Sequence, residues 1–499
     1  MADMRVPGIY ISEQQYRLNP LQIDTRCLAG FAGISERGPV DNPVMIRSFD
    51  EYLAVFGGFD TAGMLPGCVY SYFKCGGKEC VVVRVADKNA AAPASATVAA
   101  GSGHIRFTAR SPGRWGNGMT VSVWREKDGF FSISFSCKGK SESHLHLSAD
   151  EADSRYFVGY INARSSLCTA EKDGDAGIPE QVMFRNFSGG LDGIESLTAG
   201  DYIGWYDGLN DYAGIGCFES RNDISLIAVP DVCRLKDRED MAAVQETLVR
   251  QAERFPGRFA VLDVPEGLDA VDASAWAKRM DSSFAAAYYP FIDMIDPLDP
   301  VGANTMRIPP SGAVCGCIAA TDGEKGVFAA PANCLLEGAV GIATATTASE
   351  QELLYGSGIN VLRYFPGRGV KVWGARTLSS DREWKHINVR RTFSRVCAAL
   401  KQGTQWAVFE PNDKNLRKRL VRQVSGFLLD LWMKGYFAGS TAEQGFYVRC
   451  DEELNPPENI DNGILTFEAG VAIVRPVEFF RITLTAEKDG ASVYIQEDR

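Results

Sequence analysis

The sequence predicts a multi-domain protein that combines an α/β domain with an α+β domain. Apolar strand patterns alternate with helical patterns over residues 224–295, whereas residues 105–137 carry only strands with period-two alternation. Residues 346–486 carry helices that are followed by strands. A chain of 499 residues with 45% apolar residues is long enough for about three domains.

The expected α/β domain is discontinuous, with one part at residues 29–95 and the other at 188–345. Helical patterns at residues 49–56, before Arg254 and at 270–283 separate its strands. Apolar strands that alternate with helices favour a parallel sheet covered on both faces. The strands are the apolar runs FAGI (31–34), CVVVRV (80–85), ISLIAVP (224–230), FAVLDVP (259–265) and AAAYYPFIDMI (285–295).

The interruption, residues 96–187, is expected to be a β-rich insertion domain on the outer surface. Its strands are predicted by the alternating runs IRFTAR (105–110), MTVSVW (119–124) and FFSISFSC (130–137). An Ala, Ser and Gly-rich stretch between Lys88 and Arg106 predicts a flexible linker before it. The glycines of residues 173–193 predict a turn-rich boundary after it.

The C-terminal domain, residues 346–486, is predicted to contain helices at 349–355, 384–401 and 412–434. Residues 467–476 and 477–486 alternate like a pair of β-strands.

Both ends of the chain are expected to be arms, residues 1–28 and 487–499. Residues 5–12 and 492–498 are strand-like but have no hairpin partner adjacent in sequence. A strand without a partner is an aggregation hazard unless another segment covers it.

Composition excludes several classes of function. A net charge of -11 and a pI near 5.1 argue against a nucleic-acid-binding protein. The thirteen cysteines lack the regular spacing of a disulfide framework and favour a reducing cytoplasm. The N-terminal residues lack a secretory signal pattern, and no apolar run is long enough to span a bilayer. We therefore expect assembly in the cytoplasm, with neither a nucleic-acid nor a membrane partner.

The inventory of chemical groups argues against an enzyme. The four histidines are His104, His144, His146 and His386, so the second part of the α/β domain has none to activate a serine. Gly77 and Lys78 precede a glutamate and do not complete a phosphate-binding loop. We expect no catalytic residue and no cofactor.

Two cysteine and histidine patterns allow a metal reading but do not favour it. His144 and His146 are predicted to share one face of a strand, a geometry compatible with a metal, yet no third ligand is identified. Cys315 and Cys317 lie in an apolar run, where buried free thiols are the usual outcome. We expect no metal site.

The helix expected from residue 412 has two contrasting sides. Its apolar stripe consists of Leu416, Leu420, Val424, Phe427, Leu428 and Leu431. The opposite side is basic, with Lys414, Arg417, Lys418 and Arg422. On the pattern alone, a solvated face and a basic docking surface both remain open.

Several sequence motifs, in order, resemble the contractile tail sheath family of phage tails and phage-tail-like injection particles. The longest is INVLRYFPGRGVKVWGARTLSSDREWKHINVRRTF at residues 359–393, followed by GTQWAVFEPND at 403–413. Five other matching segments are PGIYISE (7–13), AGFAGISERGPVDNPVMIRSFDEYLAVFGG (29–58), SGGLDG (188–193), PPSG (309–312) and APAN (330–333).

This resemblance implies a subtilisin-like α/β domain without a catalytic triad and a C-terminal sheath domain whose basic helix faces an inner tube. It implies that the terminal arms exchange strands between neighbouring subunits, through linkers at residues 14–21 and 487–490. The exchanging residues would be Pro7, Gly8, Ile9, Tyr10, Ile11, Val493, Tyr494 and Ile495.

The function implied is that of a structural subunit. It would polymerise helically around the tube and contract to drive the tube through a target envelope. The implied partners are further copies of the chain, with or without sheath isoforms, the tube protein, and baseplate and terminator cap proteins. Two alternatives stay open, a hydrolase derived from the subtilisin-like fold and a static tube or shell component.

Overall fold

The computed structural model describes residues 21–59, 63–205, 212–255, 257–299, 301–302, 304–478, 482–487 and 490–495. Two compact units divide the chain. Residues 25–391 and the segment from Arg475 onward form the larger unit, and residues 392–474 with the segment up to Asp24 form the smaller one.

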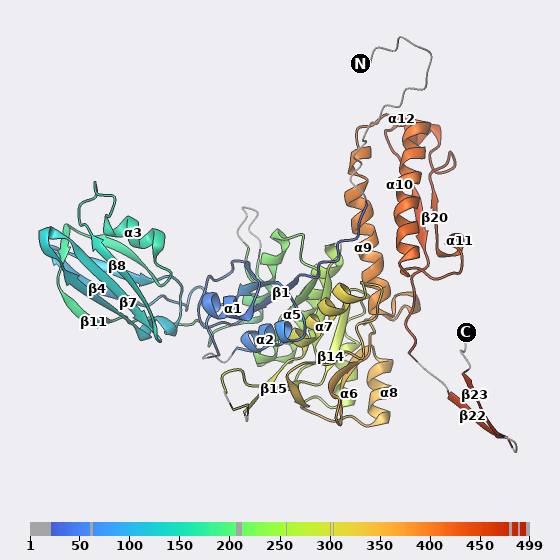
Figure 1. Cartoon of the computed structure of the whole chain (residues 1–499), viewed down its shortest axis with the longest axis horizontal. Coiled ribbons are helices and arrows are strands. Elements are labelled where there is room, and N and C mark those ends of the chain that lie inside the picture. The colour runs from blue at the N-terminus through green and yellow to red at the C-terminus, as the bar shows by residue number, and fades with distance from the viewer. Residues whose placement is uncertain are drawn as a thin grey trace, which may run out of the picture. The chain divides into compact units, whose positions relative to one another are not determined.

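The larger unit is built on an eight-stranded sheet with the order β19-β18-β14-β13-β12-β1-β3-β2 (Figure 1). Neighbours from β3 to β18 pair in parallel, and the two edge strands β2 and β19 are antiparallel. The strands are β1 (Ala29–Gly33), β2 (Val44–Ile46), β3 (Cys80–Arg84), β12 (Leu226–Ala228), β13 (Phe259–Asp263), β14 (Ala285–Tyr289), β18 (Ile359–Phe365) and β19 (Gly369–Trp373). The mixed α/β fold predicted from the apolar runs is confirmed.

Helices cover both faces of this sheet and enclose two apolar cores. One core packs under α4 (Ala199–Ile203), α5 (Arg238–Arg254), α6 (Ala270–Ala277) and α8 (Ala348–Gly356). The other packs under α1 (Phe49–Phe56), α2 (Leu65–Lys74) and α7 (Ser311–Glu324). The central strands are therefore mostly apolar, because side chains on both of their faces are buried.

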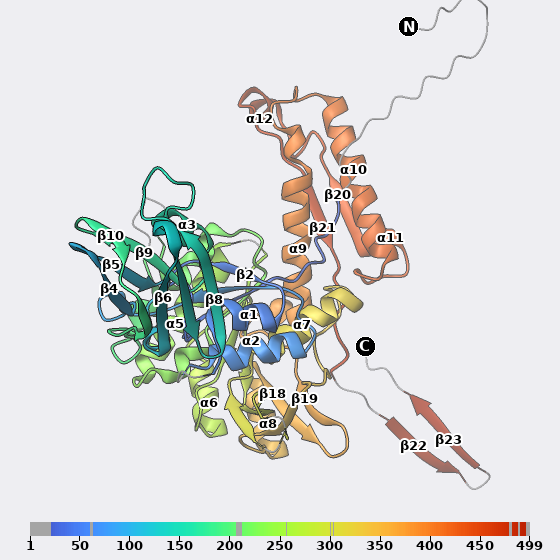
Figure 2. The same ribbon diagram turned by 60° about the vertical axis from the view of Figure 1, so that its left-hand side comes forward.

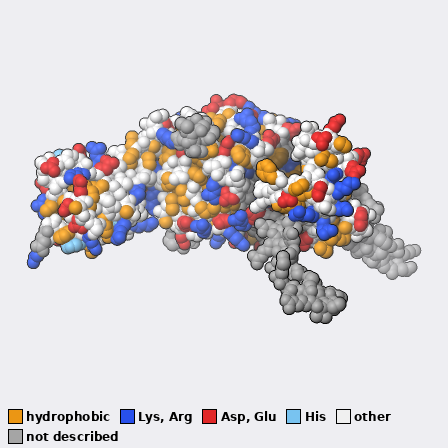
Figure 3. Space-filling view, turned by 90° about the horizontal axis from the view of Figure 1, so that it is seen from above, with side chains coloured by type: hydrophobic (Ala, Val, Ile, Leu, Met, Phe, Trp, Pro, Cys, Tyr) orange, Lys and Arg blue, Asp and Glu red, His pale blue; other side chains and the backbone are white. Residues whose placement is uncertain are grey.

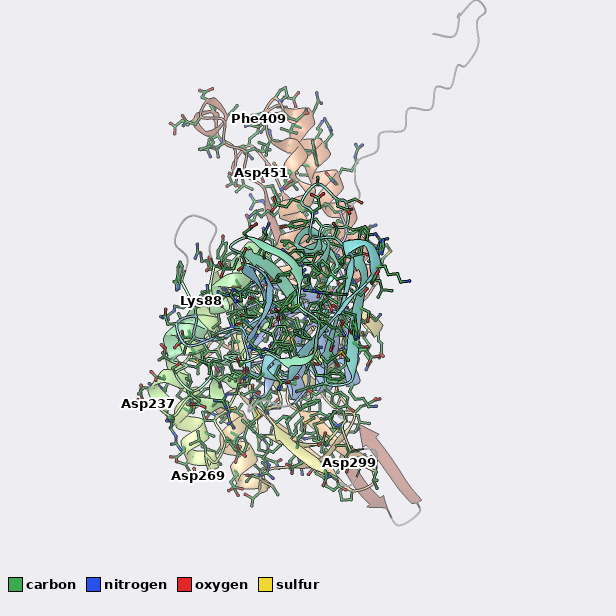
Figure 4. All side chains as sticks on the ribbon, turned by 90° about the vertical axis from the view of Figure 1, so that its left-hand side faces the viewer. Lys88, Asp237, Asp269, Asp299, Phe409 and Asp451 are labelled. Carbon is green, nitrogen blue, oxygen red and sulfur yellow. The ribbon has the colours of Figure 1, made fainter. Side chains whose placement is uncertain are left out.

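Side-chain caps determine where several of these helices begin. Ser48 Oγ accepts a hydrogen bond from the Glu51 backbone N–H at 3.1 Å, which starts α1. Asp237 and Asp269 cap α5 and α6 in the same way, and Figure 4 shows them on the same side of the unit. Each cap satisfies backbone donors that the first turn of a helix leaves without a partner.

A three-stranded antiparallel sheet, β16-β15-β17, also belongs to the larger unit. Its strands are β15 (Ile292–Ile295), β16 (Thr305–Ile308) and β17 (Ala339–Ile342).

The interrupting segment folds as two four-stranded sheets around a core of its own (Figure 2). One sheet contains β4 (Ser95–Gly101), β5 (Gly103–Ala109), β9 (Cys168–Asp173) and β10 (Ala176–Pro179). The other contains β6 (Met119–Arg125), β7 (Phe131–Cys137), β8 (Lys140–Leu147) and β11 (Val182–Asn186). Phe107, Phe135 and the helix α3 (Phe157–Arg164) contribute to the core between them.

The prediction of a flexible linker between Lys88 and Arg106 is wrong. Residues 95–101 form β4, which pairs with β5 in an antiparallel register. Ala96, Val98 and Ala100 alternate inward and are buried. Small apolar side chains therefore form the buried face of β4, although the same composition is typical of a flexible linker. The segment 173–193 likewise contains β10 and β11 between its turns.

The prediction that His144 and His146 share one strand face is also wrong. The β7–β8 register shifts between Phe131 and Ile133, and His146 has a positive φ of 56°. This bulge adds one residue to β8 and turns His146 outward, while His144 is buried.

The smaller unit contains the two long helices expected from the sequence, α9 (Ile387–Gly403), which begins in the larger unit, and α10 (Lys414–Met433). It also contains α11 (Ala442–Gly445), α12 (Pro457–Asp461) and the antiparallel pair β20 (Phe446–Arg449) and β21 (Glu468–Val471). Within 467–476, residues 468–471 therefore pair with β20, and the predicted pairing of 467–476 with 477–486 is wrong.

The last described strands form a hairpin, β22 (Ile482–Glu487) and β23 (Gly490–Ile495). The expectation that the strand-like segment 492–498 lacks an adjacent hairpin partner is wrong. In the register, Glu487 pairs with Gly490, so the two ends of the predicted linker at 487–490 belong to β22 and β23.

The assignment of β4 can be tested with Val98→Asp. We expect the free energy of unfolding of the inserted two-sheet region to fall by about 3 kcal/mol or more, because an unpaired carboxylate would be buried between the sheets. Hydrogen exchange of residues 94–187 measures this loss of stability. Thr97→Asp, on the exposed face of the same strand, is the matched control; equal effects of the two changes would contradict a strand.

Candidate functional site

Helix α10 presents the basic surface that the sequence singled out. Asp413 caps it, with Oδ1 accepting hydrogen bonds from the Asn415 and Leu416 backbone N–H groups at 2.9 and 2.7 Å. The apolar stripe is buried as predicted, comprising Leu416, Leu420, Val424, Phe427, Leu428 and Leu431.

Only three of the four predicted basic residues are exposed. Lys414, Lys418 and Arg422 lie on the surface, whereas Arg417 is only 8% exposed. The position of Arg417 next to Leu416 and one turn before Leu420 places it at the border of the apolar stripe. Arg417 is therefore a packing residue, and the surface available to a partner is smaller than the sequence suggested.

A groove of about 470 Å³ lies along these residues. One wall is basic, and the segment after β20 adds Asp451 and Glu452. Lys414 Nζ lies 3.0 Å from Glu452 Oε1, so one of the three cations is already paired. Figure 3 shows the same mixing of acidic and basic side chains on the visible face, and Figure 4 locates Asp451 in the part of the chain that contains α10.

The structure describes only three of the predicted strand-exchange residues. Pro7, Gly8, Ile9, Tyr10 and Ile11 lie outside the described residues. Val493, Tyr494 and Ile495 belong to β23, where they pair with Leu484, Thr483 and Ile482 of β22.

A buried ionic cluster just before the C-terminal hairpin was missed by the sequence analysis. Arg376 Nε donates to Glu478 Oε1 at 2.9 Å, and a second guanidinium nitrogen donates to Oε2. Tyr355 donates its hydroxyl to Glu478, and the Arg376 guanidinium lies 3.6 Å from the centre of the Tyr355 ring. The signal that could have revealed the cluster is a single acidic residue inside the apolar run PVEFF.

The electrostatics of this cluster hold Glu478 in its charged form. Burial alone would raise the pKa of Glu478, but the hydrogen bonds from Arg376 and Tyr355 and the Arg376 charge outweigh it and lower the pKa to about 2. His386 Nδ1 lies 3.5 Å from the same carboxylate, yet burial keeps the pKa of His386 below its usual value. The cluster thus holds Glu478, the last described residue before β22, against Arg376 and Tyr355 of the larger unit.

Two buried carboxylates lie where an α/β enzyme would carry its reactive groups, at the carboxyl ends of parallel strands. Asp231 follows β12 and accepts backbone N–H groups from Ile34 at 2.8 Å, from Leu65 at 3.2 Å and from Met64. Asp263 ends β13 and accepts the Ser311 N–H at 2.8 Å, at the start of α7. Burial raises the pKa of Asp231 to about 6 and that of Asp263 to about 7.

These carboxylates lack the partners of a hydrolytic centre. The ring nitrogens of His144, His146 and His386 lie against Glu142, Glu126 and Glu478. These three rings thus face carboxylates, not the hydroxyl of a serine nucleophile. The backbone bonds to Asp231 show instead that it holds three chain segments together.

The residues that the structure describes contain neither a metal-binding cluster nor a membrane-spanning helix. No group of three or more His, Cys, Asp or Glu side chains there is arranged to hold a metal ion. None of the helices that the structure describes is long and apolar enough to cross a membrane.

Two family models match successive parts of the chain. Residues 207–378 match the phage tail sheath protein central domain, and residues 379–487 match the phage tail sheath C-terminal domain.

Curated relatives carry corresponding names. The chain is 29% identical over 239 residues to a prophage major tail sheath protein of Pseudomonas aeruginosa, a match that covers 46% of this chain and 58% of that protein. It is 25% identical over 188 residues to the tail sheath protein of Vibrio phage KVP40, covering 37% of this chain and 27% of that protein. The matches thus span less than two thirds of the length of these relatives.

Solved structures share the fold over nearly the whole chain. The helical sheath of the anti-feeding prophage in its contracted state aligns with a TM-score of 0.59 and 23% identity, covering 97% of this chain and 99% of that one. A sheath tail protein from Listeria innocua aligns with a TM-score of 0.63 and 13% identity, covering 91% and 96%.

The buried carboxylates yield a pH-dependent prediction. The pKa of Asp263 is raised to about 7 from 3.8, so its contribution to stability is fully present below about pH 4 and is lost as the pH rises through 7. In Asp263→Asn, Oδ1 can still accept the Ser311 N–H and no charge is buried. We expect this variant to be more stable than the wild type by about 1 kcal/mol or more at pH 8, and no more stable at pH 4.

Thermal unfolding at several pH values measures this difference. Asp231→Asn is the contrasting variant, because both oxygens of Asp231 accept backbone N–H groups and an amide NH₂ would face one of them. We expect it to be destabilised at pH 8 as well. A gain in stability from Asp231→Asn, or none from Asp263→Asn at pH 8, would contradict these assignments.

Proposed function

The chain belongs to the phage tail sheath family, and we propose that it is the structural subunit of a contractile sheath that polymerises helically around a rigid inner tube. Contraction of this sheath drives the tube through a target envelope. The observation that carries the proposal is the pair of family matches, which together run without a gap from residue 207 to 487. The sheath fold shared over 97% of the chain supports it.

The rigid bodies of the sheath would be the discontinuous α/β domain (29–95 and 188–345), the insertion domain (96–187) and the C-terminal domain (346–486). The α/β domain would have a subtilisin-like fold without a catalytic triad. Its parallel central strands and the carboxylates at their carboxyl ends support this reading. The hydrolase alternative has no support, because both matching family models and the curated relatives are sheath proteins.

Neighbouring subunits would be linked by strand exchange through the two arms. Within the described residues, β22 and β23 form a sheet of two strands only. Such a hairpin is marginally stable alone and has two edges that can accept a further strand. Residues 7–11 of another copy would supply that strand by β-strand addition.

Head-to-tail contacts that do not close a ring produce an open helical lattice. Contraction is then a change between two packings of the same rigid bodies. The Arg376–Glu478 pair would keep each arm attached to its own subunit while the bodies rotate. Exchanged strands would hold the lattice together during that movement.

The partners of this assembly would be further copies of the chain, the inner tube protein, and baseplate and terminator cap proteins. Lys414, Lys418 and Arg422 would face an acidic tube surface. No nucleic acid, membrane or cofactor is needed for this mechanism. The subunit would assemble in the bacterial cytoplasm and remain a component of a phage tail or tail-like particle.

Electron microscopy of the purified chain, alone and with its tube protein, tests the proposed function. We expect hollow sleeves, long and narrow around the tube and short and wide without it. A chain that lacks residues 1–16 should stay folded and fail to polymerise, because the exchanged strand is missing. Sleeves of one fixed length and diameter would favour the static shell, and full assembly of the truncated chain would refute strand exchange.

The role of α10 is tested by changing Lys414, Lys418 and Arg422 to Glu. We expect tube binding to fall at least about tenfold, since like charges would oppose each other at the interface. Lys236, Arg238 and Lys278, three exposed cations of the larger unit, provide a control variant with the same change in net charge. Cosedimentation with preformed tubes measures the binding; equal binding by both variants would show that α10 does not face the tube.

A further inference from the structure

Three cysteines from distant parts of the sequence meet at the edge of the eight-stranded sheet. Cys75 ends α2, Cys317 lies in the second turn of α7, and Cys334 lies in the segment that follows α7. The segment that contains Cys334 contacts both other cysteines, because Cys317 Sγ lies 3.5 Å from Leu335 O and Cys75 Sγ lies 3.8 Å from Glu337 O. Cys75 and Cys317 are buried, whereas Cys334 is half-buried.

Cys334 packs directly against α7. Cys334 Sγ lies 3.6 Å from the Thr321 hydroxyl oxygen, and that hydroxyl donates to the Cys317 carbonyl at 2.8 Å. Cys317 Sγ lies 3.5 Å from the carbonyl oxygen of Leu335, the residue after Cys334. The two cysteines therefore face each other across the contact between α7 and this segment.

We propose that Cys317 and Cys334 form a redox site that a hydroperoxide converts to an intramolecular disulfide. The two thiols differ in pKa, so they take different roles in such a reaction. Its hydrogen bond with Cys317 lowers the pKa of the Cys334 thiol, so Cys334 is the better nucleophile. The pKa of Cys317 is raised by its thiol neighbours and by burial, so Cys317 keeps its proton while Cys334 reacts with the peroxide, and that proton is available to the hydroxyl group that leaves in the second step.

The reaction consists of two balanced steps. The Cys334 thiolate attacks one peroxide oxygen, the O–O bond breaks, hydroxide leaves and Cys334 becomes a sulfenic acid. Cys317 Sγ then attacks Cys334 Sγ, the S–O bond breaks, and the Cys317 proton leaves with the hydroxyl group as water. The two thiols lose two electrons in total, and one hydrogen peroxide becomes two waters.

The disulfide would lock the antiparallel edge of the sheet. Residues 333–336 pair with the outer side of β19, through Asn333 N–H to Val372 O at 2.7 Å and Leu336 N–H to Val370 O at 2.9 Å. Val372 N–H in turn donates to the carbonyl of Cys334 itself at 3.0 Å. A covalent bond from Cys334 to α7 would prevent this covering segment from separating from β19.

Peroxide treatment of the purified chain, followed by alkylation and peptide mass spectrometry, tests the proposal. A Cys397→Ser background removes the exposed cysteine of α9 as a source of links between molecules. We expect the Cys317–Cys334 peptide pair as the main disulfide, reversed by dithiothreitol. The melting temperature should rise by about 5 °C, because the loop closed by the bond constrains the unfolded chain.

Variants distinguish a Cys317–Cys334 disulfide from bonds that involve the other cysteines. Cys317→Ser should leave Cys334 as a sulfenic acid that dimedone traps, and Cys75→Ser should form the same disulfide as the parent chain. A bond from Cys334 to Cys75 would overturn the role of Cys317. In the chain that keeps Cys397, a Cys334 that stays reduced while Cys397 is oxidised would overturn the site altogether. This last result needs no variant, so it stands even if a variant fails to fold.

Discussion

The position of β1 between β3 and β12 is the constraint on which the larger unit depends. β1 forms parallel ladders with a strand that precedes the inserted region and with one that follows it. The two ends of the insertion must therefore lie close together, and backbone bonds hold them so, from Asp87 N–H to Gly193 O at 3.0 Å and from Ser95 N–H to Ser188 O at 2.9 Å. Because this stem is closed where β4 begins, a region with its own core can be inserted without disturbing the sheet.

Much of this architecture could be predicted from residue patterns, because apolar runs such as CVVVRV and FAVLDVP can be buried on both faces only in a central parallel strand. Helix α1 and the apolar stripe of α10 follow equally directly from capping and period. The pattern was misleading where burial is achieved with small residues, as in β4. It was also misleading where one extra residue changes the face of a strand, as at His146.

The functional surface could be predicted only in part, since exposure depends on where the partner elements lie. The basic residues of α10 follow from the sequence, but the burial of Arg417 depends on packing at the edge of the apolar stripe. The Glu478 cluster joins residues more than a hundred positions apart along the chain. Neither an amphipathic period nor a short motif records such a contact, so it becomes visible only when Arg376, Tyr355 and Glu478 are brought together in space.

The carboxyl ends of the parallel strands show how a position suited to catalysis can serve structure instead. An acid at such a site acts on a substrate only if its oxygens are accessible and a base or nucleophile stands nearby. The oxygens of Asp231 are occupied by three backbone N–H groups, from Ile34, Met64 and Leu65. Since Ile34 follows β1 and Leu65 begins α2, one buried carboxylate joins the end of a central strand to the helix that covers it. Burying this group costs free energy, and its three backbone bonds fix the end of β1 relative to α2, as the proposed movement of whole rigid bodies would require.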